Sequence, residues 1–423
     1  MANEKEAAAV VEESLWIKVK DNLPAIIVIL ITLLIAVAIG IEGGGPQLLN
    51  SVLTGGMWAL LAVGLALVFG VMNIPHFAHG ESFMVGTYVA YFTFTPINQY
   101  LQQNPNRLLA ALAPLLAILL AGIVGFILGV IMERLLFYPL RLRSKPGEWV
   151  MNAFLLTVGI SFVMINTVKL VPFLGNDFYG LGGGYWSIET VKTYPQATAE
   201  DALEGLDSDY YRPIIEYINQ EDNDVPLVEI ESEFDATRDD LQPLADKRLI
   251  GFGSADPLKS LLGIQGLTTE RAASFVISLV CIGTLWWFLR RTRTGRAIRA
   301  VSQDETGAKM MGINLNFIFP LTFGLATAMA SIAGGSLLFL TQAHPNVGLT
   351  PLYTAWFVVM MAGLGNVVGA IVGGFIVSVL QTATQQFTAA SLINVIPTII
   401  MIIVLLVVPS GIFGSEVKGI QEQ

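Results

Sequence analysis

The feature that most limits what this chain can fold into is a long uncharged stretch near its carboxyl end. From Met310 to Ser415, 106 residues contain no Asp, Glu, Lys or Arg. A soluble domain cannot be built this way, because about a quarter of the residues in such a domain are charged. Segments of about 20 apolar residues, in contrast, cross a bilayer as helices that satisfy their own backbone hydrogen bonds. The stretch therefore predicts several membrane-spanning helices.

The remaining composition agrees with a membrane protein, since 54% of the 423 residues are hydrophobic and 13% are charged. One cysteine, Cys281, excludes a disulfide framework. We predict an all-α polytopic membrane protein with about 8–10 transmembrane or re-entrant helices. Its apolar segments are expected at residues 25–41, 52–72, 83–94, 108–132, 149–168, 272–289, 317–340, 351–380 with an interruption at 363–369, and 392–408.

Residues 173–271 interrupt this pattern, because they contain no apolar run of membrane length. Between residues 200 and 246, sixteen acids face only Arg212 and Arg238, a balance of 2 − 16 = −14 in a chain whose net charge is −10. The rest of the chain therefore sums to −10 + 14 = +4. Residues 226–234 alternate apolar and acidic side chains, which is typical of a strand. We interpret the segment as an acidic insertion outside the membrane.

The orientation follows from the Lys and Arg residues near the ends of the spans, because these residues favour the cytoplasmic side. With the amino terminus inside, fourteen of them lie on the cytoplasmic side and one, Arg107, lies outside. Both termini are then cytoplasmic. The expected parts are a cytoplasmic tail at 1–23, transmembrane helices at 24–172, an extracytoplasmic insertion at 173–271, transmembrane helices at 272–414 with a cytoplasmic segment at 290–316, and a cytoplasmic tail at 415–423, with a short basic loop at 133–148.

The segment 290–314 is the most charged connection between apolar runs. Six Lys or Arg residues oppose Asp304 and Glu305. Residues 295–311 contain no proline, and apolar residues recur at helical spacing, which predicts a short surface helix. Such a helix would give a soluble partner a rigid element to push on. The alternative is a positively charged loop that only fixes the topology.

The segment NIPHFAHGE at 73–81 places a proline, two histidines and a glutamate between two apolar runs. Irregular backbone within a membrane is tolerated where it is buried in protein or lines water, so polar groups at such a break are candidates for function. The alternative is a cytoplasmic turn in which Glu81 caps the next helix. His76 and His79 alone do not complete a metal shell, and we predict no metal site.

A second break, GLGN, lies at residues 363–366. It would either expose backbone groups to a substrate or only pack closely, since Gly365, Gly369 and Gly373 lie four residues apart. Gly125 and Gly129 share this spacing.

Sequence motifs for several kinds of chemistry are absent. The chain contains no phosphate-binding loop of the G-x-x-x-x-G-K-[ST] type, no nucleophile elbow and no H-E-x-x-H pair. We therefore predict that it is not an enzyme and does not itself bind or hydrolyse ATP.

Four segments taken together resemble one family. They are NIPHFAHGESFMVGTYVAY (73–91), VIMERLLFYPLRLRS (130–144), TGRAIRAVSQDETGAKMMGIN (294–314) and MAGLGNVVGAIVGGFIVSVL (361–380). In this order and spacing they are similar to the permeases of branched-chain amino-acid ABC importers, of the LivH/LivM type and closer to LivH. The likeness covers residues 50–172 and 272–414. It does not extend to the insertion or to the acidic amino terminus.

The resemblance implies a permease subunit that moves branched-chain or other apolar amino acids across the plasma membrane by alternating access. Residues 295–312 would be the coupling helix that docks on a cytoplasmic ATPase. The residues that match the coupling segment are Gly295, Arg296, Arg299, Asp304, Ala308, Gly312 and Asn314. The residues expected to line the translocation path are Asn73, His76, Phe77, His79, Glu81, Gly365 and Asn366.

The resemblance also implies the partners. These are a second, LivM-like permease, two ATP-binding-cassette ATPases that hold ATP and magnesium, an extracytoplasmic substrate-binding protein, and the lipid bilayer. No cofactor is expected on this chain, and no nucleic acid. The acidic insertion would be either a solvated loop or a dock for the binding protein.

Three other functions stay open from the residues. Urea and short-chain amide permeases resemble the same family, so the substrate is not restricted to amino acids. An ion-coupled secondary transporter would need an ionisable residue within a span, and residues 310–415 contain none. A structural or sensory scaffold would place its function in the insertion. Co-purification of an ATPase would separate a transporter subunit from a scaffold.

Overall fold

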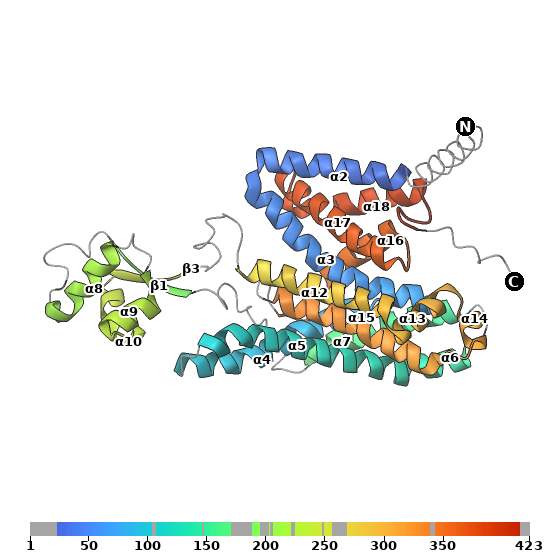
Figure 1. Cartoon of the computed structure of the whole chain (residues 1–423), viewed down its shortest axis with the longest axis horizontal. Coiled ribbons are helices and arrows are strands. Elements are labelled where there is room, and N and C mark those ends of the chain that lie inside the picture. Colours follow the sequence, from blue (N-terminus) through green and yellow to red (C-terminus); the bar gives the residue numbers. More distant parts are fainter. Residues whose placement is uncertain are drawn as a thin grey trace, which may run out of the picture. The chain divides into compact units, whose positions relative to one another are not determined.

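The computed structural model describes residues 23–103, 107–145, 148–170, 188–194, 203, 206–220, 225–247, 249–255, 269–338 and 343–414. The chain forms two compact units (Figure 1). One unit, here called the membrane body, comprises Met1–Gly182 and Arg271–Gln423. The other, here called the inserted unit, comprises Gly183–Glu270. The inserted unit corresponds closely to the insertion predicted at 173–271.

The described part of the membrane body is helical, as predicted. Eight of its helical segments are long and apolar enough to cross a membrane, and Leu349–Ala362 is a shorter apolar helix. The elements are α2 (Leu23–Glu42), α3 (Gly44–Met72), α4 (His79–Gln103), α5 (Arg107–Met132), the π-helix η1 (Glu133–Phe137), α6 (Tyr138–Arg143), α7 (Trp149–Leu170), α12 (Thr269–Arg291), α13 (Arg293–Gln303), α14 (Glu305–Met310), α15 (Leu315–Leu337), α16 (Leu349–Ala362), α17 (Val367–Phe387), the 3-10 helix η3 (Ala390–Leu392) and α18 (Val395–Val407).

Helices α3 and α15 form the centre of the body. Helix α15 packs on α3, α4 and α5, and α17 packs on the other side of α3. Figure 1 shows α3 between a group formed by α2, α16, α17 and α18 and a group formed by α4, α5, α7, α12 and α15. Small residues permit these close contacts. The hydroxyl of Thr327 on α15 donates to the carbonyl of Gly125 on α5 at 2.9 Å, where the glycine spacing predicted close packing.

One end of the body, here called the connector end, carries α6, α13 and α14 (Figure 1). Helix α2 begins at this end, and residues 410–414 that follow α18 return to it, where Phe413 donates its backbone N–H to Ala362. The first and last described residues of the chain therefore lie at the same end as the charged segment. This is the arrangement that the count of Lys and Arg residues predicts.

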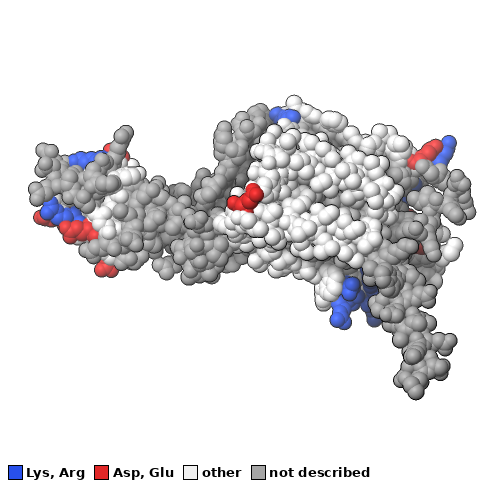
Figure 2. Space-filling view, turned by 90° about the horizontal axis from the view of Figure 1, so that it is seen from above, with Lys and Arg blue, Asp and Glu red and all other residues white. Residues whose placement is uncertain are grey.

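Charged side chains are scarce on the side of the membrane body between its two ends. In Figure 2 the blue and red residues of this unit lie near the ends, and the broad surface between them is white. Large apolar side chains cover the outer helices, including Leu34 on α2, Leu119 on α5 and Leu406 on α18, all of which are exposed. Such a surface is stable against lipid and costly against water.

The prediction of a basic loop at 133–148 is wrong for its first eleven residues. Helix α5 continues through η1 into α6, which ends at Arg143. The backbone N–H of Tyr138 donates to the carbonyl of Glu133, the i to i−5 bond of a π-helix. The charged residues here do not indicate a loop, because Arg141 is paired with Glu133 inside the protein.

The inserted unit combines a small sheet with three helices. Its antiparallel sheet has the order β2-β1-β3, formed by β1 (Ile188–Thr193), β2 (Val225–Pro226) and β3 (Ile250–Ala255). The helices are α8 (Ser208–Gln220), α9 (Leu227–Phe234) and α10 (Arg238–Asp246). Residues buried between the helices and the sheet include Val191, Ile214, Ile230 and Leu241. The unit thus has its own core, so the all-α prediction holds for the described membrane body and not for the insertion.

The strand predicted at 226–234 is also wrong, because residues 227–234 form α9. Leu227, Ile230 and Phe234 recur at helical spacing as well as in the alternation. The helix turns all three toward the core, where Leu227 and Ile230 are buried. Eight residues satisfy both periods, and tertiary burial decides between them.

A capping box begins α10 and compensates for some of the acidic charge. The Thr237 backbone N–H donates to the Asp240 carboxylate at 2.9 Å, and the Asp240 N–H donates to the Thr237 hydroxyl. These hydrogen bonds lower the pKa of Asp240 below its usual value, because they stabilise the charged form.

We expect Ile214→Ala to unfold the inserted unit selectively. Ile214 and Ile230 are both fully buried in its core, and deleting such a side chain costs about 2–5 kcal/mol. The measurement is limited proteolysis of the full chain in detergent. The variant should be cut within residues 183–270 while the membrane body stays intact. Glu216→Ala, at an exposed position on the same helix, is the control and should resist like the wild type.

Candidate functional site

The segment 73–81 runs back into the bundle after α3 ends. Asn73 closes α3 in the left-handed conformation, with φ of 53°. Six residues later, a ring nitrogen of His79 lies 3.1 Å from the carbonyl oxygen of Leu61. Because Leu61 precedes Met72 by eleven residues, α4 begins about 16 Å inside the bundle, at 1.5 Å per residue. We call residues 73–81 the re-entrant segment.

Contacts to several helices hold the re-entrant segment. The Thr157 hydroxyl of α7 donates to the carbonyl of Pro75 at 3.0 Å. The ring of Phe77 packs on Trp356 of α16 and on Phe154 of α7, with centroid distances of 4.8 and 5.3 Å. These contacts, and the 2% exposure of Glu81, do not fit a surface turn in which Glu81 caps a helix in water.

His76 and His79 lie side by side in the interior. Their ring centroids are 5.6 Å apart, and His76 is 4.7 Å from Phe323 of α15. Neither ring nitrogen of His76, nor Nδ1 of His79, has a hydrogen-bond partner among the described residues. In the same part of the chain, no three His, Cys, Asp or Glu residues are grouped as a metal site would require.

Helix α16 also begins in the interior, and it meets the start of α4. A Cβ on Gly80 would lie 2.5 Å from the carbonyl oxygen of Gly348, the residue before α16. Any larger side chain at either glycine would separate the two helix starts. Helix amino ends carry partial positive charge, and discontinuous helices that meet inside a bundle are typical of transporters.

Glu81 is held by α7. Its Oε1 accepts a hydrogen bond from the Ser161 hydroxyl at 2.7 Å, and its Oε2 is buried without a hydrogen-bond partner in the described structure. The predicted path residues Asn73, His76, Phe77, His79 and Glu81 therefore all belong to one buried or half-buried segment, apart from Asn73, which is exposed.

The GLGN break lies elsewhere, at the connector end. Gly363 and Gly365 have φ of +106° and +79°, values that disfavour other residues. Asn366 caps α17 by accepting from the Gly369 N–H at 2.8 Å, and its amide donates to the carbonyl of Phe413 at 2.6 Å. A Cβ on Gly365 would lie 2.7 Å from Gly70, near the end of α3. The structure thus does not bring Gly365 and Asn366 together with Glu81.

The charged segment forms two short helices, α13 and α14, where one helix was predicted. The backbone extends at Asp304, with φ of −156°, so Asp304 ends α13 and precedes α14. Aspartate favours such positions because its short side chain can cap a helix. Ile298 and Val301 of α13 and Ala308 of α14 are buried, which attaches both helices to the body.

The seven predicted coupling residues divide into two groups. Gly295, Ala308 and Gly312 shape the segment: a Cβ on Gly295 would overlap the backbone of Phe288 and Leu289, and Gly312 has φ of +82°. Arg296, Arg299 and Asp304 are exposed, and Asn314 is exposed at the start of α15. The fold therefore leaves a polar surface available for a partner.

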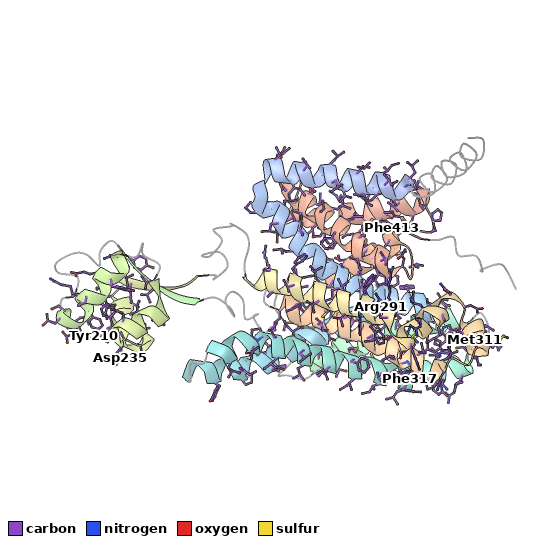
Figure 3. The ribbon with its side chains drawn as sticks, in the orientation of Figure 1. Tyr210, Asp235, Arg291, Met311, Phe317 and Phe413 are labelled. Carbon is purple, nitrogen blue, oxygen red and sulfur yellow. The ribbon has the colours of Figure 1, made fainter. Side chains whose placement is uncertain are left out.

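Sequence reasoning missed two residues on this surface. Met310 and Met311 are 82% and 83% exposed, and Figure 3 shows Met311 at the connector end. Exposed apolar side chains beside basic ones are typical of a protein interface, in which methionine is enriched. The adjacent methionines in a charged segment were the available signal.

A buried ion pair lies beneath α14. Arg141 donates to Glu133 at 2.7 Å, and the Glu133 side chain is 1% exposed. The guanidinium of Arg141 lies 3.9 Å from the ring centroid of Phe319 on α15 and 5.3 Å from that of Trp149 on α7. Glu305 of α14 also interacts electrostatically with Arg141. The pair, here called the 133–141 clasp, thus connects three helices of the body to the charged segment.

Comparison with known proteins agrees with this arrangement. Residues 47–405 match the family described as the branched-chain amino acid transport system permease component. The chain is 25% identical to the high-affinity branched-chain amino acid transport permease LivH of Escherichia coli K12, over 87% of this chain and 94% of the relative. It is 24% identical to BraD of Pseudomonas aeruginosa, over 87% and 95%, and 24% identical to a probable LivH of Methanocaldococcus jannaschii, over 88% and 93%. No solved structure matches the chain.

Proposed function

Because this chain belongs to the family of branched-chain amino acid transport permease components, we propose that it is the membrane subunit of an ATP-driven importer for branched-chain or other apolar amino acids. The family match over residues 47–405, which spans the bundle and the charged segment, carries this proposal. The chain itself is a transport subunit and not an enzyme. ATP and magnesium would be held by separate ATPase subunits, since the sequence has no phosphate-binding loop.

In this proposal the connector end faces the cytoplasm of the cell and the membrane is the plasma membrane. The positive-inside rule supports this placement, because the exposed Arg296 and Arg299 lie at that end. The amino and carboxyl ends of the chain are then cytoplasmic, and the inserted unit is extracytoplasmic.

The charged segment is the proposed docking site of the ATPase. Its exposed arginines and Met310 and Met311 would contact the partner, while Ile298, Val301 and Ala308 transmit the movement to the body. Closure of an ATPase dimer would then move two such segments, one from this chain and one from a second LivM-like permease. Rigid helices that move as units would open the bundle alternately to each side. An extracytoplasmic binding protein would deliver the amino acid.

We expect Arg299→Glu to weaken ATPase docking while the permease remains folded. Arg299 is exposed on α13, so the substitution reverses a charge without disturbing the core. Removing a charged interface contact costs about 2–5 kcal/mol of binding, a loss of roughly 30-fold or more. The measurement is co-purification of the ATPase encoded beside this chain, together with leucine uptake by vesicles that contain the assembled transporter.

The control for this experiment is Lys169→Glu, an equal charge reversal at an exposed position near the far end of α7. It should leave co-purification unchanged. Normal ATPase binding and uptake by the Arg299→Glu variant would count against docking on α13. Failure of the wild-type assembly to take up any apolar amino acid, with urea or an amide taken up instead, would refute the proposed substrate.

A further inference from the structure

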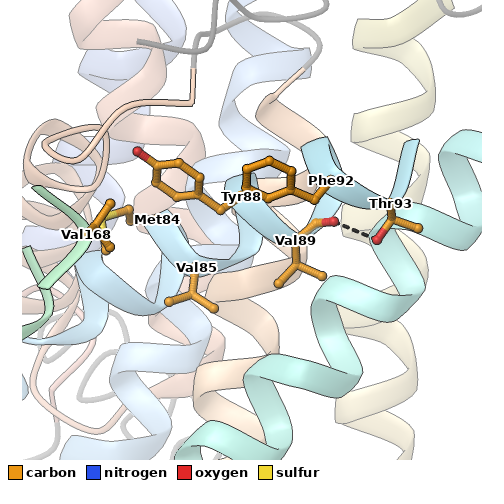
Figure 4. Close-up of a pocket in the computed structure, with 7 residues that line it drawn as sticks. All are labelled: Met84, Val85, Tyr88, Val89, Phe92, Thr93 and Val168. Carbon is orange, nitrogen blue, oxygen red and sulfur yellow. Dashed lines mark hydrogen bonds between the residues drawn. The ribbon is translucent and has the colours of Figure 1, made fainter. Parts of the chain in front are cut away.

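A pocket of about 380 Å³ lies between α4 and α7, above the re-entrant segment. Its lining residues are Met84, Val85, Tyr88, Val89, Phe92, Thr93 and Val168, and Figure 4 shows their side chains around it. The walls are almost entirely apolar. The hydroxyl of Thr93 is directed back to its own helix, where it donates to the carbonyl of Val89 at 2.7 Å. The volume is within the range of small-molecule sites, about 300–1,000 Å³.

Glu81 lies on the same side of α4 as this pocket. Met84, Val85 and Tyr88 follow it at intervals of three, four and seven residues, which place all four on one helical face. On α7, Ser161 precedes the pocket residue Val168 by seven residues, which is again two helical turns. The hydrogen bond between Ser161 and Glu81 therefore joins the two helices at one end of the pocket.

The carboxylate at this end has an unused acceptor. Oε1 of Glu81 accepts from Ser161, whereas Oε2 is buried without a hydrogen-bond partner among the described residues. No salt bridge to Glu81 is found in the described part of the chain, where the bridge between Arg141 and Glu133 is present. A buried carboxylate is costly unless a cation or a hydrogen-bond donor compensates it. The site therefore favours a ligand that brings positive charge.

We propose that the α4–α7 pocket binds an apolar α-amino acid, with the ammonium group at Glu81 and the side chain against Met84, Val85 and Tyr88. This assignment rests on the proposed transport function and specifies the part of this chain that recognises the substrate. An ammonium group supplies the charge that Oε2 lacks, and a branched apolar side chain gains from burial against these walls. Ser161 is a positioning residue, because it orients the carboxylate through Oε1.

The proposal predicts which part of leucine is recognised. The probes are leucine, 3-methylbutylamine, which lacks the carboxylate, and 4-methylpentanoate, which lacks the ammonium group. Binding is measured on the purified full chain in lipid vesicles by competition with radiolabelled leucine. Leucine and 3-methylbutylamine should compete, and 4-methylpentanoate should not.

Two substitutions test the residues. Glu81→Gln keeps the size and the contact with Ser161 but removes the charge, and it should weaken leucine binding by about 10- to 100-fold. Met84→Trp should fill the pocket and reduce binding to a similar degree. Val163→Trp is the control for size, because Val163 is exposed on α7 and does not line the pocket. All variants should unfold within a few degrees of the wild type without leucine.

The outcomes separate this proposal from the proposed function. If the assembled transporter imports leucine while Glu81→Gln binds and imports it like the wild type, the pocket assignment is overturned and the transport function stands. Absence of leucine binding by the wild-type chain overturns the assignment too. If brominated lipid quenches the new tryptophan of Met84→Trp and leucine does not compete with that lipid in the wild type, the pocket is an acyl-chain site. If the assembly imports no amino acid at all, the proposed function fails.

Discussion

The Arg141→Met variant should destabilise the membrane body by about 3–5 kcal/mol, the usual cost of leaving one partner of a buried ion pair alone. Glu133, which is 1% exposed, would lose the guanidinium that lies 2.7 Å from its Oε1. Its Oε2 already lacks a hydrogen-bond partner among the described residues, so the remaining structure cannot compensate the charge. Methionine preserves the apolar stem that packs on Phe319 and Trp149, which restricts the change mainly to the charge.

The measurement is unfolding of the purified chain in mixed micelles as SDS is titrated. The double variant Glu133→Gln, Arg141→Met should recover much of the loss, because it leaves no buried charge unpaired. Arg143→Met is the matched control. Arg143 is exposed on the same helix α6, and its substitution should change the free energy of unfolding by less than about 0.5 kcal/mol. Equal effects at Arg141 and Arg143, with no recovery in the double variant, would show that the clasp does not stabilise the body.

The 133–141 clasp also marks a limit of sequence reasoning. Charges at 133–145 between two apolar runs predicted a loop, because a charge in a sequence does not reveal its partner. The partner here is eight residues away on a continuous helix, and a π-turn at Tyr138 allows the chain to continue without a break. Only the three-dimensional contact converts an unfavourable buried charge into a tolerated pair.

The helices themselves could be predicted well, because membrane spans depend on length and apolar composition alone. The segment expected at 149–168 became α7, and the break at 43–46 coincides with the junction of α2 and α3. The charged segment was located for the same reason, since loop charge is visible in the sequence. Its division at Asp304 was not predicted, because capping geometry depends on how Ala308 and Val301 attach to the body.

The depth of the re-entrant segment could not be predicted either. The sequence NIPHFAHGE is compatible with a turn at the membrane surface and with a break inside the bundle. The contact of His79 with Leu61 decides between them, and it depends on the packing of Gly64 and Gly80 against neighbouring helices. The pocket above Glu81 likewise combines residues of α4 and α7 that are more than seventy positions apart.

Gly86→Val should prevent the membrane body from assembling, and it is the second substitution from which we expect a large effect. A Cβ at Gly86 of α4 would overlap the backbone carbonyl and Cα of Ser331 on α15, which are backbone atoms that cannot rotate away. The two helices are also joined here by the Ser331 hydroxyl, which donates to the carbonyl of Ser82 at 2.8 Å. Forcing helices apart costs more than the 1–3 kcal/mol typical of one added methylene in a packed core, and three added carbon atoms should exceed the roughly 5–15 kcal/mol available only together with the lost contacts.

The graded series Gly86→Ala and Gly86→Val therefore gives the test. Gly86→Ala should fold with a loss of about 2–3 kcal/mol in the SDS titration, and Gly86→Val should be recovered mainly as aggregate on size-exclusion chromatography. Gly159→Val on α7 and Gly283→Val on α12 are the controls, because a Cβ at either position meets no atom within 4 Å. Both controls should elute as the wild type does. If Gly86→Val also elutes and unfolds normally, α4 and α15 are not in contact at Ser331, and the position of the re-entrant segment at the amino end of α4 would have to be revised.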